Sequence, residues 1–243
     1  MNENYSYSYE WDSKYCYANS FVLKNKFNIT NNEQLEIAER EYTALSIAEI
    51  KHTPVKGNLD LKHLQSIHKQ IFNDIYDWAG ELRTVNISKG NSFYNHMYIL
   101  EGAEEIFSKL KRENYLIGIS QPDIHDKLAY YLGEINVLHP FREGNGRAQR
   151  IFIEYLAQVA GYSIDFSNIT DIEMIEASVE AFNCNYNKMT EIFKKATKTN
   201  SREEQVNFIN SIALKNSSIV KTYEKLYGEI EDVLLEDDWD LER

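Results

Sequence analysis

One stretch of this sequence, residues 137–150, gathers side chains that could do chemistry on a phosphate chain. It holds one histidine, one glutamate, an asparagine between two glycines, and three arginines. Pro140 disfavours helical geometry at the residue before it, so a helix should end at or near His139. An imidazole with an ordinary pKa of about 6.5 is available as a neutral base at physiological pH. We therefore expect His139 to take a proton from an incoming hydroxyl group.

The residues that follow this histidine favour anion binding. Residues 144–146 should begin the next helix, where backbone N–H groups and the positive end of the helix dipole form a cradle for phosphate. Asn145 adds a possible side-chain donor. Arg147 and Arg150 share one helix face and could bind further phosphates. Glu143 among these cations could hold Mg²⁺, which takes one or two carboxylates plus phosphate oxygens and water.

Each of these features has an ordinary explanation when it is taken alone. A histidine before proline usually marks a helix end, Gly-x-Gly is usually a turn, and arginines three apart usually lie on a solvated face. Apolar residues at helical spacing precede and follow the stretch, from Ile124 to Leu138 and from Ala148 to Val159. The order of the features within one predicted helix–loop–helix favours the functional interpretation.

At this point the sequence resembles the Fic family. Residues 139–150 fill every fixed position of the Fic motif HPFx(D/E)GNGRxxR, and the resemblance extends over roughly residues 15–195, including 17–26 and 86–90. It implies protein adenylylation, in which AMP passes from ATP to a Tyr, Thr or Ser hydroxyl of a target protein and pyrophosphate leaves.

The resemblance also implies individual roles within the motif. His139 would be the base, Phe141 a core anchor for the loop, and Glu143 the carrier of Mg²⁺. The phosphate-binding residues would be Gly144, Asn145 and Gly146 as the cradle, Arg147 for the β-phosphate and Arg150 for the γ-phosphate.

An alternating segment upstream predicts a small β-hairpin. Residues 82–88 alternate in polarity, residues 89–91 suit a turn, and residues 92–94 could return. An exposed strand edge can receive an extended peptide. In Fic proteins such a hairpin, the flap, docks the target beside the catalytic histidine. The resemblance assigns this role to Ile87, Ser88, Lys89, Gly90, Asn91, Ser92, Phe93 and Tyr94, although an ordinary surface hairpin would look the same.

Many Fic proteins inhibit themselves with a helix of the pattern (S/T)xxxE(G/N), whose glutamate pairs with the last arginine of the motif. Residues 199–204 have the spacing but lack the final Gly or Asn, and residues 46–49 are one residue too short. We therefore expect a toxin-type enzyme without an internal inhibitory helix. A separate small antitoxin would supply a glutamate to Arg150.

Composition limits the other possibilities. The 243 residues are 43% apolar, and 3 Pro and 10 Gly favour long helices. A formal net charge of −12 argues against nucleic-acid or anionic-membrane partners. Cys16 and Cys184 show no metal spacing and are expected to be reduced thiols. Without a signal peptide or an apolar run of about 20 residues, we expect a cytoplasmic protein, with delivery into a host cell left open.

The predicted fold is mainly α, a Fic-type helical bundle with one small β-hairpin flap as its only strand pair. Residues 1–32 should form an irregular arm, residues 33–196 the catalytic domain, and residues 197–243 a helical appendage with an acidic tail. Helix starts are expected near Thr30, Asp60 and Thr170, and a helix end at Gly161. The arm is expected to pack through Tyr15, Tyr17, Phe21, Val22 and Leu23, and its tyrosines are interpreted as packing or exposed side chains rather than as sites of self-modification.

Other functions remain open on sequence alone. The Doc branch of the family transfers a phosphoryl group and has lysine where Gly146 stands here. Another nucleotide, such as UTP, could replace ATP because no motif marks the base-binding wall. His63 and His68 are five apart on one helix, which does not suit two metal ligands on one face. A Fic-fold module that binds without catalysis is the alternative of a different class.

Overall fold

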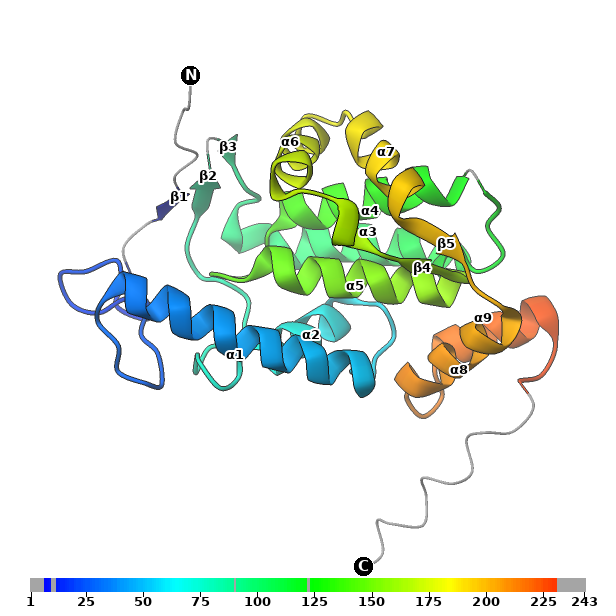
Figure 1. Cartoon of the computed structure of the whole chain (residues 1–243), viewed down its shortest axis with the longest axis horizontal. Coiled ribbons are helices and arrows are strands. Elements are labelled where there is room, and N and C mark those ends of the chain that lie inside the picture. The colour runs from blue at the N-terminus through cyan, green and yellow to red at the C-terminus, as the bar shows by residue number, and fades with distance from the viewer. Residues whose placement is uncertain (1–6, 10–11, 90, 122, 231–243) are drawn as a thin grey trace, which may run out of the picture.

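The fold is carried by helices packed in layers around one central helix (Figure 1). The computed structural model describes residues 7–9, 12–89, 91–121 and 123–230. The α-helices are α1 (Asn32–His52), α2 (Leu61–Phe72), α3 (Ile99–Arg112), α4 (Asp123–Leu138), α5 (Asn145–Ala160), α6 (Asp171–Phe182), α7 (Asn187–Ala196), α8 (Arg202–Ile212) and α9 (Ser218–Tyr227). Short 3₁₀ helices follow as η1 (His96–Tyr98), η2 (Asn114–Leu116) and η3 (Phe166–Asn168). The predicted mainly α fold is confirmed.

Helix α5 lies at the centre of the core. It packs against α2, α4 and α8, and its residues Phe152, Ile153, Leu156 and Ala157 are all 0% exposed. The adjoining helix α4 buries its own apolar stripe and packs in turn against α6 and α7. The predicted active loop joins α4 to α5, so both of its ends are held by well-buried helices.

Local signals set several helix ends. Asp60 caps α2 by accepting a hydrogen bond from the His63 N–H, and Thr170 caps α6 in a capping box with Glu173. Gly161 ends α5 with φ 96°, a left-handed conformation that suits glycine. These three predictions are confirmed. The start of α1 differs by one residue, because Asn31 rather than Thr30 provides the capping oxygen.

The β structure is larger than the single hairpin predicted. Strands β2 (Ile87–Lys89) and β3 (Asn91–Ser92) form the hairpin, and β1 (Tyr7–Tyr9) pairs antiparallel with the other edge of β2. A second sheet joins β4 (Tyr162–Ile164) to β5 (Thr197–Thr199). The expectation of one strand pair is therefore wrong. Strands of two or three residues are too short for alternation of side chains to mark them.

The N-terminal arm covers one end of the active loop. Tyr15 and Cys16 are each 1% exposed, and the Tyr15 ring packs edge-on against Trp78. Phe21 was expected to pack here as well, but it is 66% exposed, so that expectation is wrong. The tight turn around Phe21, closed by a bond from the Tyr17 N–H to the Val22 carbonyl, directs it outwards.

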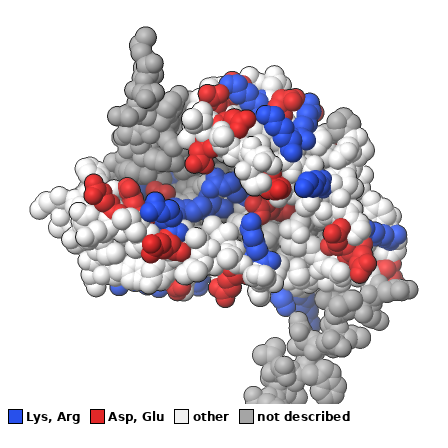
Figure 2. Space-filling model, in the orientation of Figure 1, with Lys and Arg blue, Asp and Glu red and all other residues white. Residues whose placement is uncertain are grey.

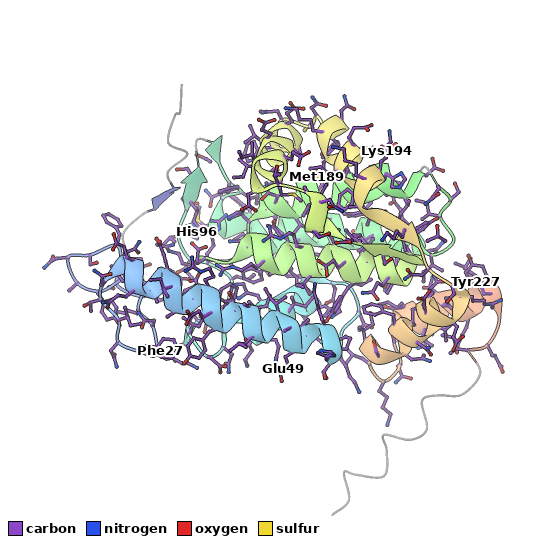
Figure 3. The ribbon with its side chains drawn as sticks, in the orientation of Figure 1. Phe27, Glu49, His96, Met189, Lys194 and Tyr227 are labelled. Carbon is purple, nitrogen blue, oxygen red and sulfur yellow. The ribbon has the colours of Figure 1, made fainter. Side chains whose placement is uncertain are left out.

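The C-terminal helices pack on the core. Ile209 and Ile212 of α8 are 0% exposed, and Phe208 packs edge-on against Tyr155 of α5. Tyr227 at the end of α9 lies at the far end of the molecule from His96, which follows the hairpin (Figure 3). The predicted division at residue 196 stays a prediction, and the predicted acidic tail lies outside the described residues from 231 onwards.

Two further properties bear on the environment of the protein. Both cysteines are free, with Cys16 buried and Cys184 exposed after α6. Along the described residues, no helix combines the length and the hydropathy that a membrane crossing requires.

Candidate active site

The histidine of the motif lies where α4 ends. Helix α4 ends at Leu138, as predicted, and His139 has φ 45°, in the left-handed region. The His139 Nδ1 lies 3.2 Å from the Asn136 carbonyl oxygen. A carbonyl can only accept, so Nδ1 carries the proton in this contact, and the acceptor lone pair is on Nε2. This tautomer is the one that a general base requires.

The predicted flap lies against this imidazole. The rings of Phe93 and His139 stack with centroids 3.7 Å apart and an angle of 13° between planes. The Phe93 N–H donates to the Ile87 carbonyl at 3.1 Å, and the Tyr94 N–H donates to the Val137 carbonyl at 3.0 Å. The structure therefore brings the two predicted parts of the site, flap and histidine, into direct contact.

The loop after the histidine is closed by Asn145. Its Oδ1 accepts from the Phe141 N–H at 2.9 Å, and its Nδ2 donates to the Phe141 carbonyl at 2.8 Å. Phe141 is 0% exposed and stacks on His68 with centroids 3.9 Å apart, which agrees with the predicted anchor. These two bonds hold the Asn145 side chain against Phe141, and the main-chain N–H of Asn145 lies in the first turn of α5, where it can face a phosphate.

The predicted phosphate cradle is the N-terminus of α5. Gly144 precedes the helix with φ 78° and provides no side-chain cap. The first N–H groups of a helix lack acceptors within the helix, so those of residues 145–147 can face an anion. A Cβ on Gly144 would lie 2.1 Å from the Phe72 ring, whereas one on Gly146 would meet nothing closer than 3.5 Å. Glycine is therefore required at position 144, whereas the space beside Gly146 is open except for the Arg150 side chain.

The two arginines on this helix differ in their contacts. Arg147 Nη2 lies 2.5 Å from Glu39 Oε1 of α1, and its Nη1 donates to Thr43 at 3.2 Å. Within the described ranges Arg150 makes no hydrogen bond or ion pair. Burial and Arg147 lower its pKa, and the charges of Asp171 and Glu154 act in the opposite direction. An arginine remains charged at neutral pH. Arg150 is therefore the cation of the motif that can still take a phosphate or a carboxylate.

Glu143 can hold a cation beside the cradle. Its Oε1 accepts from the Gly144 N–H at 2.9 Å and lies 3.8 Å from Arg147 Nη2. Burial and the nearby Glu39 carboxylate raise the pKa of Glu143. In the part of the chain that the structure describes, no group of three or more His, Cys, Asp and Glu side chains is arranged so that it could hold a metal ion by itself. A Mg²⁺ ion here would therefore need phosphate oxygens and water to complete its shell.

Three residues outside the motif support this site, and none of them was assigned to it from the sequence. His68 accepts from the Gly80 N–H at Nδ1 and bonds the Glu143 carbonyl through Nε2 at 2.9 Å. Burial lowers the pKa of His68 to about 3, so it stays neutral. Glu39 holds Arg147, and the buried Arg83 donates to the His139 carbonyl at 2.7 Å. A histidine on an apolar helix face was the single local signal among them.

The charge on this face is uneven. Figure 2 shows basic side chains gathered near the middle of the face, where the start of α5 passes α1, with acidic side chains around them. The overall charge of −12 therefore includes a basic locus at the predicted cradle. Such a distribution suits a small anionic ligand better than a duplex of nucleic acid.

Comparison with known families agrees with this geometry. A profile of the Fic/DOC family matches residues 58–157, which hold α2, the flap, α4, the active loop and most of α5. The chain is also 43% identical over 157 residues to a probable protein adenylyltransferase Fic of Escherichia coli, covering 64% of this chain and 77% of that protein. The chain belongs to the Fic/DOC family.

Two further relatives carry related names. The protein adenylyltransferase VbhT of Bartonella schoenbuchensis is 39% identical over 175 residues, which are 72% of this chain but 37% of VbhT. The crystal structure of the BepC protein of Bartonella tribocorum with bound AMPPNP matches with a TM-score of 0.72 and 29% identity, over 77% of this chain and 98% of that chain. The predicted family and the Fic-type fold are confirmed.

Proposed function

We propose that this chain is a protein adenylyltransferase that moves AMP from ATP to a Tyr, Thr or Ser hydroxyl of a target protein. The observation that carries the proposal is the His139 imidazole, with its acceptor on Nε2, at the start of a loop that leads into the N-terminal cradle of α5. The names of the relatives and the AMPPNP bound to BepC support the same reaction.

The proposed reaction uses the residues of the loop in order. His139 takes the proton of the target hydroxyl at Nε2 while the hydroxyl oxygen attacks the α-phosphorus of ATP. A bond forms between that oxygen and phosphorus, the bond from phosphorus to the bridging oxygen breaks, and pyrophosphate leaves with its electron pair. The N–H groups at the start of α5, those of residues 145–147, stabilise the negative charge on the phosphates together with the side chains of Arg147 and Arg150.

Mg²⁺ is part of the proposal. Its fit rests on the Glu143 carboxyl beside the cradle, whose pKa is raised by burial and by the nearby Glu39 carboxylate, so that a bound cation would stabilise its charged form. When bound, Mg²⁺ would neutralise charge on the phosphate chain. Glu143 would hold it, and His68 orients Glu143 through its main-chain carbonyl.

The target protein would dock on the flap, residues 87–94. Support comes from the stack of Phe93 on His139, which joins the hairpin to the base, and from the capacity of strand edges to bind extended peptides. In the structure β1 of the chain itself pairs with one edge of β2. A target strand would therefore exchange with β1 or use the edge of β3.

A separate antitoxin is proposed as the inhibitor. It would insert a glutamate beside Arg150, the motif arginine that makes no hydrogen bond or ion pair within the described residues. Addition of such a protein should abolish AMP transfer. Arg150→Ala lowers transfer because Arg150 also binds phosphate, and the transfer that remains in this variant should be insensitive to the added protein. Inactivity of the chain alone, relieved by truncation of either end, would contradict this proposal. We also propose that the enzyme acts in a cytoplasm, its own or that of a host.

The test of the reaction is label transfer. The full chain is incubated with Mg²⁺ and a bacterial lysate, with ATP labelled at the α-phosphate in one sample and at the γ-phosphate in the other. Protein-bound α-label that disappears in His139→Ala is the expected result. Protein-bound γ-label lost in the same way would establish phosphoryl transfer, as in the Doc branch, and overturn AMP transfer. No label in either sample would favour a binding module.

A further inference from the structure

Arg83 lies in the loop between α2 and β2 and is 2% exposed. Its Nε donates to the His139 carbonyl at 2.7 Å, and its Nη1 donates to the Val85 carbonyl at 2.7 Å. Its Nη2 donates to the carbonyl oxygens of Tyr94 and, at 3.4 Å, of Leu138. One side chain thus makes four hydrogen bonds to main-chain oxygens around the site.

These four carbonyl groups belong to two different parts of the site. Leu138 and His139 end α4, where helical carbonyls lack partners within the helix and carry partial negative charge. Val85 and Tyr94 flank the hairpin, two residues before β2 begins and two residues after β3 ends. The planar guanidinium group therefore ties the end of the helix that carries the base to both ends of the hairpin that would hold the target.

The positive charge of the buried Arg83 side chain is offset by the dipoles of the carbonyl groups that it contacts. Burial lowers the pKa of Arg83 to about 10, so the group stays charged at neutral pH. In the described part of the chain no carboxylate pairs with Arg83. A buried cation needs full hydrogen bonding, and here the carbonyl oxygens of the site provide it. The hydrogen bonds therefore hold both the Arg83 guanidinium group and the four carbonyl groups in position.

The backbone at His139 needs such support. Its φ of 45° is a left-handed conformation that L-residues other than glycine adopt at an energetic cost. Conformations of this kind persist where the surroundings over-determine them. Arg83 contacts both peptide groups that follow, through Nε to the His139 carbonyl and through its own N–H to the Pro140 carbonyl at 2.8 Å. The imidazole direction depends on this backbone.

We propose that Arg83 is a positioning residue that holds His139 in its left-handed conformation and keeps the imidazole in register with the flap. It contacts neither phosphate nor target. Its effect on the rate rests on the proposed role of His139 as the base. Without Arg83 the backbone relaxes and the imidazole turns away from Phe93, so that transfer slows while the nucleotide still binds.

The first test compares rate with binding in the full chain. The variants are Arg83→Met and Arg83→Lys, and the control is Gln205→Met, which removes a buried donor to the Val159 carbonyl on the other side of the core. We expect α-label transfer to the lysate proteins that the wild type labels to fall about 100-fold in Arg83→Met, with the Kd for AMPPNP changed by less than about two-fold. Arg83→Lys keeps the positive charge but lacks the planar set of N–H donors, so its transfer rate should lie between those of Arg83→Met and the wild type.

Two results in this comparison would overturn the role of Arg83. One is a rate loss no larger than that of Gln205→Met, after correction for the folded fraction. The other is a loss of AMPPNP affinity that accounts for the whole loss of rate, since Arg83 would then act on nucleotide binding. If Arg83→Met does not fold, Arg83→Lys is subjected to the same two criteria.

The second test does not depend on activity. In nucleotide-free protein, the Phe93 ring stacked at 3.7 Å should shift the ring-proton NMR signals of His139 upfield. These signals are assigned by their absence in His139→Ala. They should move in both Arg83 variants and stay in place in Gln205→Met. Unmoved signals in a folded Arg83 variant overturn the positioning role. Moved signals support it even if the wild type transfers no α-label, which would instead refute the proposed function.

Discussion

The active loop, residues 139–150, and the flap, residues 87–94, meet at one ring stack but are built differently. Buried groups from elsewhere in the chain hold the loop, with Arg83 at His139, His68 at Glu143 and Phe72 under Gly144. The flap has strands of three and two residues joined by a few backbone bonds. The difference indicates that the core fixes the residues of the proposed chemistry, whereas the proposed contact with the target is left adaptable. Changes in the loop should therefore affect stability, and changes in the flap should affect rate.

The largest effect on stability is expected at Gly144. A Cβ there would meet the Phe72 ring at 2.1 Å and hold φ 78°, so Gly144→Ala should lower the free energy of unfolding by about 3 kcal/mol. Gly146→Ala meets nothing closer than 3.5 Å and should change it by less than about 0.5 kcal/mol. Denaturant unfolding measures both. Equal stabilities would show that the loop is as adaptable as the flap.

Titration of His68 should make the folded chain less stable at acidic pH. Its pKa is about 3 in the folded chain against an ordinary 6.5, so the unfolded chain binds a proton more readily between these values. The contribution of His68 to the free energy of unfolding is therefore at its maximum above pH 6.5. It falls as the pH drops from 6.5 towards 3, by up to about 1.4 kcal/mol per pH unit.

The measurement is denaturant unfolding of wild type and His68→Gln at pH 7, 6, 5 and 4. His68→Gln keeps a donor for the Glu143 carbonyl but does not titrate, so its stability should fall less steeply. Parallel curves for the two proteins would mean that the loop can accept a charged imidazole, against the rigid support described for it.

Phe93 tests the flap half of the comparison. Phe93→Ala removes the stack on His139 and should slow AMP transfer about ten-fold while lowering stability by less than about 1 kcal/mol. The matched control is Phe166→Ala, which removes a half-buried ring that packs edge-on against Phe193. A large stability loss in Phe93→Ala with a proportionate rate loss would make the flap part of the core.

The smallest effect is expected at Glu39. Glu39→Gln weakens the hold on Arg147, whose side chain is 23% exposed, and should tighten AMPPNP binding about two- to five-fold because the arginine is released to phosphate. Glu36→Gln on the exposed side of α1 is the control. Weaker binding in Glu39→Gln would instead mean that Glu39 orients Arg147 for the nucleotide.

The features that the sequence predicted are those encoded by neighbouring residues. Pro140 predicts the end of α4, and Gly161 predicts the end of α5. Asp60 and Thr170 predict the starts of α2 and α6. The motif itself is contiguous, so its residues were identified before any tertiary contact was known. Local geometry suffices for such features because each depends on backbone preferences within about one turn of helix.

The missing features depend on residues distant in sequence. His68 and Arg83 reach the loop from 75 and 56 residues away, and their partners are main-chain carbonyls, which any residue type provides. Glu39 contacts Arg147 from 108 residues away. The short strands β1, β4 and β5 likewise depend on pairing across the chain rather than on their own pattern. Sequence alone could nominate these side chains as buried but could not assign them to the site.

The two cysteines offer a practical route to watching the flap. Cys184 is exposed, lies two residues after α6 ends at Phe182, and is the single accessible thiol because Cys16 is buried. The Phe182 ring meets Phe93 edge-on with centroids 6.1 Å apart. A fluorescent dye attached by maleimide at Cys184 would therefore sit beside the hairpin in the natural sequence. Its emission, followed during mixing with a target, would report when the hairpin engages.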